Sequence, residues 1–331
     1  MRFALSAQHI EFARSINGLL REAGTPAVIR AWAAGEHASG LALWRRLAEV
    51  GVTALAVPEQ HGGLGADPVD LAVAFETMGY HAMPGPIVES IAVLPALLAP
   101  DDALAGRWLP GIADGSSIAT VAMAPHVPYA LDADVADIRL QVTDSGLAEF
   151  TPAAVPLDSV DAARRLYEVM GRRAISRRET AADAAFDHGV LACAAQLLGL
   201  GQRLLDDSVE YAKQRNQYGN PIGSYQAIKH LLADVATQLE LARPLLHGAA
   251  VALAGDAATT SRDVSAAKVA CGDAGYLAAR TALQVHGAIG YTAEHDLGRW
   301  LTKARALRSA WGTPAFHRAR VLDALMAERA S

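Results

Sequence analysis

The sequence predicts an α+β fold that is mostly helical, with three parts along the chain. Of its 331 residues, 52% are apolar but only 6% are aromatic, a composition that favours packed helices over an all-β fold. Apolar residues recur at helical spacing towards both ends, whereas short strand-like runs and prolines gather between them. We therefore expect an N-terminal helical domain over residues 1–115, a small β-domain over 116–186 and a C-terminal four-helix bundle over 187–331.

The N-terminal part begins with two predicted helices, over residues 6–24 and about 39–50. The Ser6 hydroxyl can cap the first helix by accepting a hydrogen bond from an exposed backbone N–H, and Gly24 can end it. Residues 57–65 read Val-Pro-Glu-Gln-His-Gly-Gly-Leu-Gly, which predicts a tight turn between apolar segments.

The middle part changes character. The runs 118–123 and 138–142 are rich in β-branched and apolar residues, as short strands are. Four prolines interrupt the surrounding sequence and limit the length of any strand. They are Pro125, Pro128, Pro152 and Pro156. This region is therefore expected to form a small sheet.

The C-terminal part returns to helical spacing. Apolar residues repeat every three or four positions over 191–205 and 228–246, and further helices are expected over about 261–287 and 294–328. Four long antiparallel helices would form a bundle. Cys193 and Cys271 lie far apart within these helical patterns, so we expect buried, reduced thiols.

The charge of the chain and the length of its apolar stretches argue against several kinds of partner and location. The net charge of −6 with scattered Lys and Arg argues against nucleic acid as the main partner. The first nine residues carry an apolar run too short for a signal peptide. Asp, Arg or Gln interrupts each apolar stretch, so we expect no membrane span and a cytoplasmic location.

Two motifs in the C-terminal part stand out. Arg215-Asn216-Gln217-Tyr218-Gly219 follows a predicted helix of about 24 residues, and 284–292 reads Gln-Val-His-Gly-Ala-Ile-Gly-Tyr-Thr. Each has an ordinary structural interpretation: a cation at a helix C-terminus interacts favourably with the helix dipole, and Gly commonly ends a helix. His286 is expected to be structural.

Together these motifs resemble the Arg-x-x-Phe/Tyr-Gly and Gln-x-His-Gly-Gly-x-Gly-Tyr-Thr signatures of the acyl-CoA dehydrogenase family, and 57–65 resembles that family's Pro-Glu-x-x-Gly-Gly-x-Gly loop. The resemblance covers nearly the whole chain. It implies FAD as cofactor, an acyl-CoA substrate and a role in lipid metabolism. It also implies that five residues contact FAD held mainly by a neighbouring subunit. These are Arg215 at the pyrophosphate, Gln217, Tyr218, and, on the adenosine side, Gln284 and Gly287. The second glycine of the usual pair is Ala288 here.

The family's catalytic base is absent from both of its usual positions. Removing the α proton of a thioester requires a desolvated carboxylate, which the family supplies as Glu. The position in the Glu-Gly-Thr motif is Trp311, and the alternative position, counted back from Arg215, is Gly189. Asp187 remains a weak candidate for a displaced base. Glu294 matches a second Glu of many relatives and is expected to be structural.

The flavin-ring loop is also missing. Where the family has a Thr-Glu-x-x-x-Gly-Ser-like loop, residues 124–129 read Ala-Pro-His-Val-Pro-Tyr. The residues that a family member uses to hold its own flavin ring and to take the α proton are missing here. The residues that contact the FAD of a neighbouring subunit are mostly kept. This pattern resembles the short subunits of heteromeric acyl-CoA dehydrogenases. It implies a paralogous partner in an α2β2 assembly, which supplies the Glu, and an electron-transferring flavoprotein as acceptor. Three alternatives stay open: a homo-oligomer with Asp187 as base, a scaffold subunit without redox chemistry, and a flavin-dependent monooxygenase on the same fold. The last is disfavoured because such members also need their own flavin-ring pocket.

Overall fold

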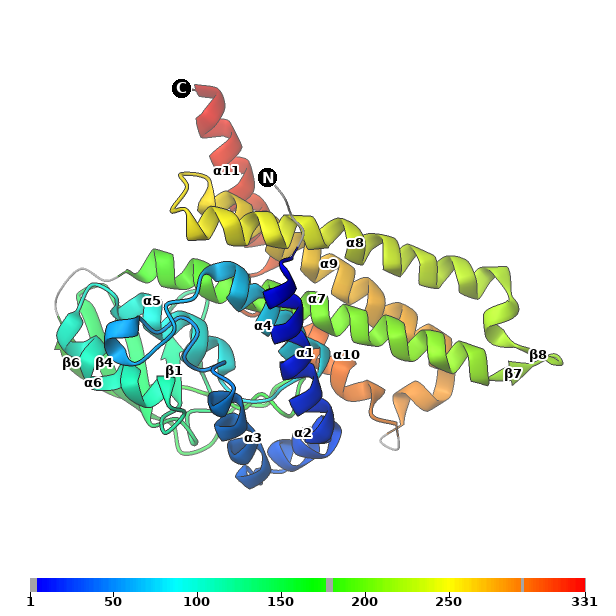
Figure 1. Ribbon diagram of the computed structural model, residues 1–331, viewed down its shortest axis with the longest axis horizontal. Coiled ribbons are helices and arrows are strands. Elements are labelled where there is room, and N and C mark those ends of the chain that lie inside the picture. Colours follow the sequence, from blue (N-terminus) through cyan, green and yellow to red (C-terminus); the bar gives the residue numbers. More distant parts are fainter. Residues whose placement is uncertain (1–4, 177–180, 293–294, 331) are drawn as a thin grey trace.

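Three groups of elements make up the computed structural model, which describes residues 5–176, 181–292 and 295–330. A small sheet lies at one end of a set of long helices, a β-hairpin lies at the opposite end, and helices of the N-terminal part lie alongside the set between them (Figure 1). The described structure is therefore α+β and mostly helical, as the sequence predicts.

The first helix begins where the sequence indicates. The Ser6 hydroxyl accepts a hydrogen bond from the His9 backbone N–H, and Gly24 follows the helix in the left-handed region. A helix that the sequence analysis did not anticipate then covers Thr25–Ala33. The helices of this part are α1 (Ala7–Glu22), α2 (Thr25–Ala33), α3 (Ala38–Glu49), η1 (Glu59–His61), α4 (Pro68–Tyr80), η2 (Val88–Val93), α5 (Leu94–Leu98) and α6 (Asp102–Ala113).

The middle part contains a four-stranded sheet of order β1-β3-β4-β6. Strand β1 pairs parallel with β3, and the other neighbours pair antiparallel. The Ser90 hydroxyl in η2 donates to the Ala119 carbonyl at 2.8 Å and accepts from its N–H, which fixes η2 against β1. The strands are β1 (Ala119–Ala122), β2 (Ala130–Leu131), β3 (Ile138–Thr143), β4 (Gly146–Pro152), β5 (Leu166–Tyr167) and β6 (Val169–Ser176).

The C-terminal part is built around α7, which packs against α4, α8 and α9. Glycine allows the close crossing of α7 and α4, because a Cβ on Gly199 would lie 1.9 Å from the Glu76 carbonyl oxygen. The elements are α7 (Ala182–Gln214), β7 (Asn216–Gln217), β8 (Asn220–Pro221), η3 (Ile222–Ser224), α8 (Gln226–Ala254), α9 (Thr260–His286), η4 (Gly287–Tyr291), α10 (Leu297–Ser309) and α11 (Pro314–Ala330).

The expectation of one helix over 294–328 is wrong. The helix is broken between α10 and α11, where Trp311 and Gly312 have φ values of 58° and 97°. The His317 ring holds this turn, because its Nε2 lies 2.8 Å from the Trp311 carbonyl oxygen and donates to it. Pro314 then starts α11 at a position that suits proline.

Helix α7 also qualifies the expectation of no membrane span. Among the described residues, it alone has the length and apolar composition needed to cross a bilayer. However, 89% of its most apolar window is buried inside the fold, as in the central helix of a bundle. Both cysteines are free and buried, as expected.

Candidate functional site

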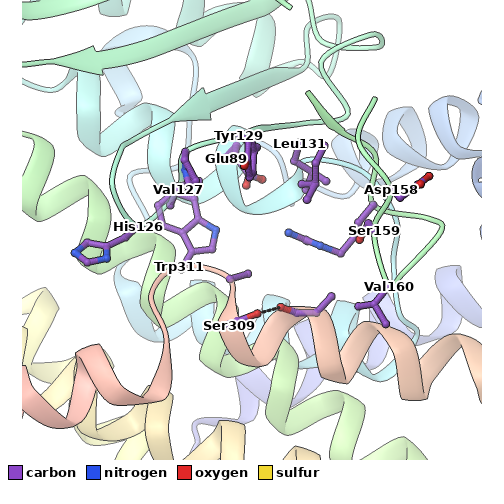
Figure 2. Close-up of a pocket in the computed structure, with 15 residues that line it drawn as sticks. Glu89, His126, Val127, Tyr129, Leu131, Asp158, Ser159, Val160, Ser309 and Trp311 are labelled. Carbon is purple, nitrogen blue, oxygen red and sulfur yellow. Dashed lines mark hydrogen bonds between the residues drawn. The ribbon is translucent and has the colours of Figure 1, made fainter. Parts of the chain in front are cut away.

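A cavity of about 390 Å³ lies where the three parts of the chain meet (Figure 2). Its wall comes from η2, from the loops of the β-domain and from the C-terminal end of α10. Its lining includes Glu89, Leu131, Val160, Arg164, Ala310 and Trp311. Its volume falls in the range of small-molecule pockets.

The two positions at which a catalytic Glu was expected face each other beside this cavity. A Cβ built on Gly189 would lie only 2.4 Å from Cε3 of Trp311, so the indole ring lies directly on the Gly189 backbone. The Trp311 side chain is only 2% exposed. Two sites that are 122 positions apart in the sequence thus converge on one place, and a ring that cannot accept a proton fills it.

An acid that the sequence analysis missed lies in the same cavity. Glu89, from η2, is 2% exposed, and its Oε2 has no hydrogen-bond partner among the described residues. Burial raises the pKa of its carboxyl, and the nearby charge of Arg164 and the Trp311 indole N–H oppose this only in part. The sequence did contain a signal, since Glu89 is the only charged residue between positions 82 and 100.

Asp187 does not line the cavity. Its carboxylate accepts hydrogen bonds from Arg320 of α11 at 2.6 Å and from Ser261 of α9 at 2.7 Å. It is therefore held in a buried ion pair between helices α7, α9 and α11. His188 is bound locally, through Nδ1 to the Ala184 carbonyl. Glu294 lies outside the described residues.

The loop at the expected flavin-ring position closes on itself. Met123 and Val127 exchange two backbone hydrogen bonds, of 2.7 and 2.8 Å, so these N–H groups are not free to bind a ligand. The ring of His126 lies 3.8 Å from that of Phe316, centroid to centroid. Residues 124–129 contain no Ser, Thr or Gly, so this loop does not fit an isoalloxazine ring.

The other predicted cofactor residues lie at the opposite end of the bundle, next to the β7–β8 hairpin (Figure 1). The Tyr211 ring stacks on His286 at 4.3 Å, which joins the end of α7 to the end of α9 and brings the two motifs together. Burial lowers the pKa of His286, and its Nδ1 donates to the Ala282 carbonyl, which holds the ring in place.

The side chains at this hairpin end are open to solvent. Arg215, Gln217, Tyr218, Gln284 and Gly287 are all exposed, and Tyr218 is 92% exposed at a φ of 52°. No hydrogen bond or ion pair joins the Arg215 guanidinium to another residue in the described part of the chain. No atom lies within 4 Å of a Cβ built on Gly287, so its backbone is open to close approach by a ligand. These five residues are called the hairpin-end group below.

The cavity and the hairpin-end group are too far apart to serve one cofactor within a single chain. Helix α7 runs from one to the other, and a rise of about 1.5 Å per residue puts Gly189 and Arg215 about 39 Å apart.

Comparison with known proteins identifies matches along almost all of the sequence. Residues 6–116 match the model "Acyl-CoA dehydrogenase, N-terminal domain", and residues 178–326 match "Acyl-CoA dehydrogenase, C-terminal domain". The chain is 33% identical over 295 residues to acyl-CoA dehydrogenase IpdE2 of Mycobacterium tuberculosis, covering 88% of both proteins.

Solved structures agree on the fold. Butyryl-CoA dehydrogenase from Megasphaera elsdenii superposes with a TM-score of 0.86 at 21% identity, covering 98% of this chain and all of that one. A chain in the ChsE4-ChsE5 complex from Mycobacterium tuberculosis gives a TM-score of 0.79 at 25% identity, covering 98% of this chain and 99% of that one.

Proposed function

The chain belongs to the acyl-CoA dehydrogenase family, and on this premise we propose that it is a subunit of a heteromeric, FAD-dependent acyl-CoA dehydrogenase. In this proposal it completes the FAD site of a paralogous partner, and the partner supplies the catalytic Glu. The reaction is α,β-dehydrogenation of an acyl-CoA thioester.

The state of the Arg215 side chain carries this proposal. A guanidinium binds phosphate oxygens through a planar fork and keeps its charge at any working pH. Arg215 is exposed and unpaired within the described chain, beside a hairpin whose Tyr225 hydroxyl donates to the Gln217 carbonyl at 2.9 Å. An anchored hairpin with a free guanidinium suits an anion presented by another chain.

The residues around the cavity of the same chain also support the proposal. Trp311 and Gly189 take the two Glu positions, and the 123–127 turn uses its own backbone donors. Because the cavity lies about 39 Å from Arg215, a single chain cannot complete one flavin site from both ends.

FAD supplies the hydride acceptor when it is bound. The residues of this chain would bind and orient it: Arg215 the pyrophosphate, Tyr218 an aromatic face of the cofactor, and Gln284 with Gly287 the adenosine side. The ring and the acyl group would lie on the partner. A Glu there takes the α proton as a general base, and donors to the thioester carbonyl stabilise the developing enolate.

The proposed assembly is α2β2, and an electron-transferring flavoprotein is the proposed acceptor. The similarity to a chain of the ChsE4-ChsE5 complex fits a two-component enzyme. A cytoplasmic location remains a prediction from the sequence.

The test measures FAD per protomer and turnover for the chain alone, and for the chain co-expressed with a paralogous candidate partner. Arg215→Ala should lower the FAD content of the complex and its affinity for added FAD by about tenfold or more, since it removes charge-assisted hydrogen bonds. The control is Arg45→Ala. Arg45 is exposed on α3 and also has no partner among the described residues.

Three outcomes would contradict the proposal. Full FAD retention and turnover by the chain alone would favour the homo-oligomer. Unchanged flavin content and turnover in the Arg215→Ala complex would favour a scaffold without a role in cofactor binding. Loss of flavin in both the Arg215→Ala and Arg45→Ala complexes would show that the effect is not specific to the hairpin end.

A further inference from the structure

Arginines from three helices gather on one outer surface of a chain whose net charge is −6. The sequence of α10 contains no Asp or Glu, and α10 and α11 both pack against α9. The guanidinium carbons of Arg305 and Arg308, on α10, lie 6.0 and 4.6 Å from the ring centroid of Tyr276 on α9. Arg318, near the start of α11, joins them through Asp273.

A single carboxylate balances these charges. Asp273 accepts hydrogen bonds from Arg308 at 2.8 Å and from Arg318 at 2.6 Å, so both of its oxygens are used. No hydrogen bond or ion pair joins the exposed Arg305 to another residue within the described ranges. The surface therefore keeps an excess of positive charge and free N–H donors.

This excess extends further along α9. Arg280 is exposed, has no hydrogen bond or ion pair to any residue that the structure describes, and lies about one turn beyond Tyr276 on the same side of the helix. The basic patch below means Tyr276, Arg280, Arg305, Arg308 and Arg318. Cation–π contacts with the tyrosine ring hold two of its side chains in place, and side chains ordered in advance lose less rotamer freedom on binding.

The basic patch continues into the hairpin-end group. Positions 276, 280 and 284 follow one another at four-residue spacing, so they lie along one side of α9. Arg280 is about 6 Å from Gln284 along the helix axis, and Tyr276 is about 12 Å from it. In the proposed function Gln284 faces FAD held by the partner subunit, so a partner at the hairpin end lies next to the basic patch.

We infer that the basic patch is a docking surface for an acidic region of the paralogous partner subunit, and that it favours this partner over a second copy of the chain. The inference rests on the proposed function. Carboxylates of the partner would accept charge-assisted hydrogen bonds from Arg280 and Arg305. A symmetric pair of identical chains through this surface would instead bring arginines against arginines, and opposed like charges weaken association.

Dissociation of the co-expressed complex on dilution, followed by analytical ultracentrifugation with excess FAD present, tests this inference. The double variant Arg280→Glu with Arg305→Glu should weaken association by about tenfold or more at about 0.05 M NaCl. The difference from the wild type should shrink at about 0.5 M NaCl, because salt screens charges at the surface. Arg280→Gln with Arg305→Gln should have a smaller effect, since it removes the charges without reversing them.

Arg45→Glu is the matched control, because Arg45 is exposed on α3 and also has no partner among the described residues. It should leave the dissociation constant unchanged. Circular dichroism of each variant establishes that it is folded.

Three results would overturn the inference. The first is an unchanged dissociation constant for the folded double Glu variant, and the second is an equal loss of affinity in Arg45→Glu. The third is self-association of the chain alone that the double Glu variant weakens, which would assign the patch to a second copy. Arg215→Ala is expected to change flavin content and the patch variants to change subunit association, so either proposal can fail while the other holds.

Discussion

Replacing Gly189 with Ala should destabilise this protein, although Ala is the better helix former. Gly189 lies inside α7 with a negative φ, so its backbone accepts any L-residue. The added methyl group would lie 2.4, 2.5 and 2.8 Å from Cε3, Cζ3 and Cδ2 of Trp311. These are ring atoms of a side chain that is 2% exposed, and its turn is fixed by His317, so the ring cannot turn aside cheaply.

The magnitude follows from two opposing effects. Overpacking of a tight core costs about 1–3 kcal/mol. Replacing Gly with Ala within a helix stabilises that helix by about 0.8–1.0 kcal/mol. We therefore expect Gly189→Ala to lower the free energy of unfolding by about 1 kcal/mol, and by about 2 kcal/mol at most. For a chain of 331 residues this lowers the Tm by about 1–3 °C.

The effect of Gly189→Ala on the free energy of unfolding should reverse when the Trp311 ring is absent. In a Trp311→Ala background no atom of residue 311 reaches the new methyl group, so Gly189→Ala should stabilise by up to about 1 kcal/mol. The coupling between the two sites would then be about 2 kcal/mol.

Urea unfolding of the four proteins in this cycle, followed by far-UV circular dichroism, measures that coupling. An equal cost of Gly189→Ala in both backgrounds would refute the contact on which the convergence of the two Glu positions rests. Trp311→Leu provides a milder second background if Trp311→Ala proves too unstable to measure.

Two further predictions concern buried polar groups. Asp187→Ala should lower the free energy of unfolding, measured with urea, by about 3 kcal/mol or more, because it leaves Arg320 without its carboxylate partner. Turnover of the complex per folded molecule should stay unchanged. Loss of that turnover would restore Asp187 as a candidate base. Burial lowers the pKa of His317 to about 4, below its ordinary value of 6.5, so the unfolded chain takes up the proton first and stability falls as the pH drops from 6.5 towards 4. Between pH 7 and pH 5 this loss of stability amounts to about 2 kcal/mol. His317→Gln should remove it, whereas the exposed control His230→Gln should not. Unfolding curves of each variant at the two pH values measure the difference.

Local patterns predicted much of the fold because their causes are local. The helix at Ser6 starts where a hydroxyl can cap it, and the strand-like runs became β1 and β3. The break at Trp311 was not predicted, although Gly312 and Pro314 are residues that commonly mark a helix boundary. The left-handed conformation of the turn depends also on a tertiary hydrogen bond from His317, which the sequence does not show.

The site was predictable only in part, for a related physical reason. The two motifs that meet at the hairpin end carry distinctive residues, and their proximity follows from helix lengths. Glu89 carries no motif, and its relevance depends on which cavity η2 faces, which is a property of packing between distant segments. The contact of Trp311 with Gly189 likewise joins segments whose spacing in sequence gives no indication of it.

The separation of the two ends explains how one chain can lose a catalytic base and still keep a cofactor-binding surface. Gly189 and Arg215 lie on one helix but about 39 Å apart, and effects on residues at such distances are usually additive. Filling the cavity end with Trp311 therefore does not disturb the guanidinium at the hairpin end, which depends only on its own anchored turn. The effects of Trp311→Ala and Arg215→Ala on flavin affinity should accordingly be additive. A measured coupling energy between them would show that the two ends of α7 are energetically linked.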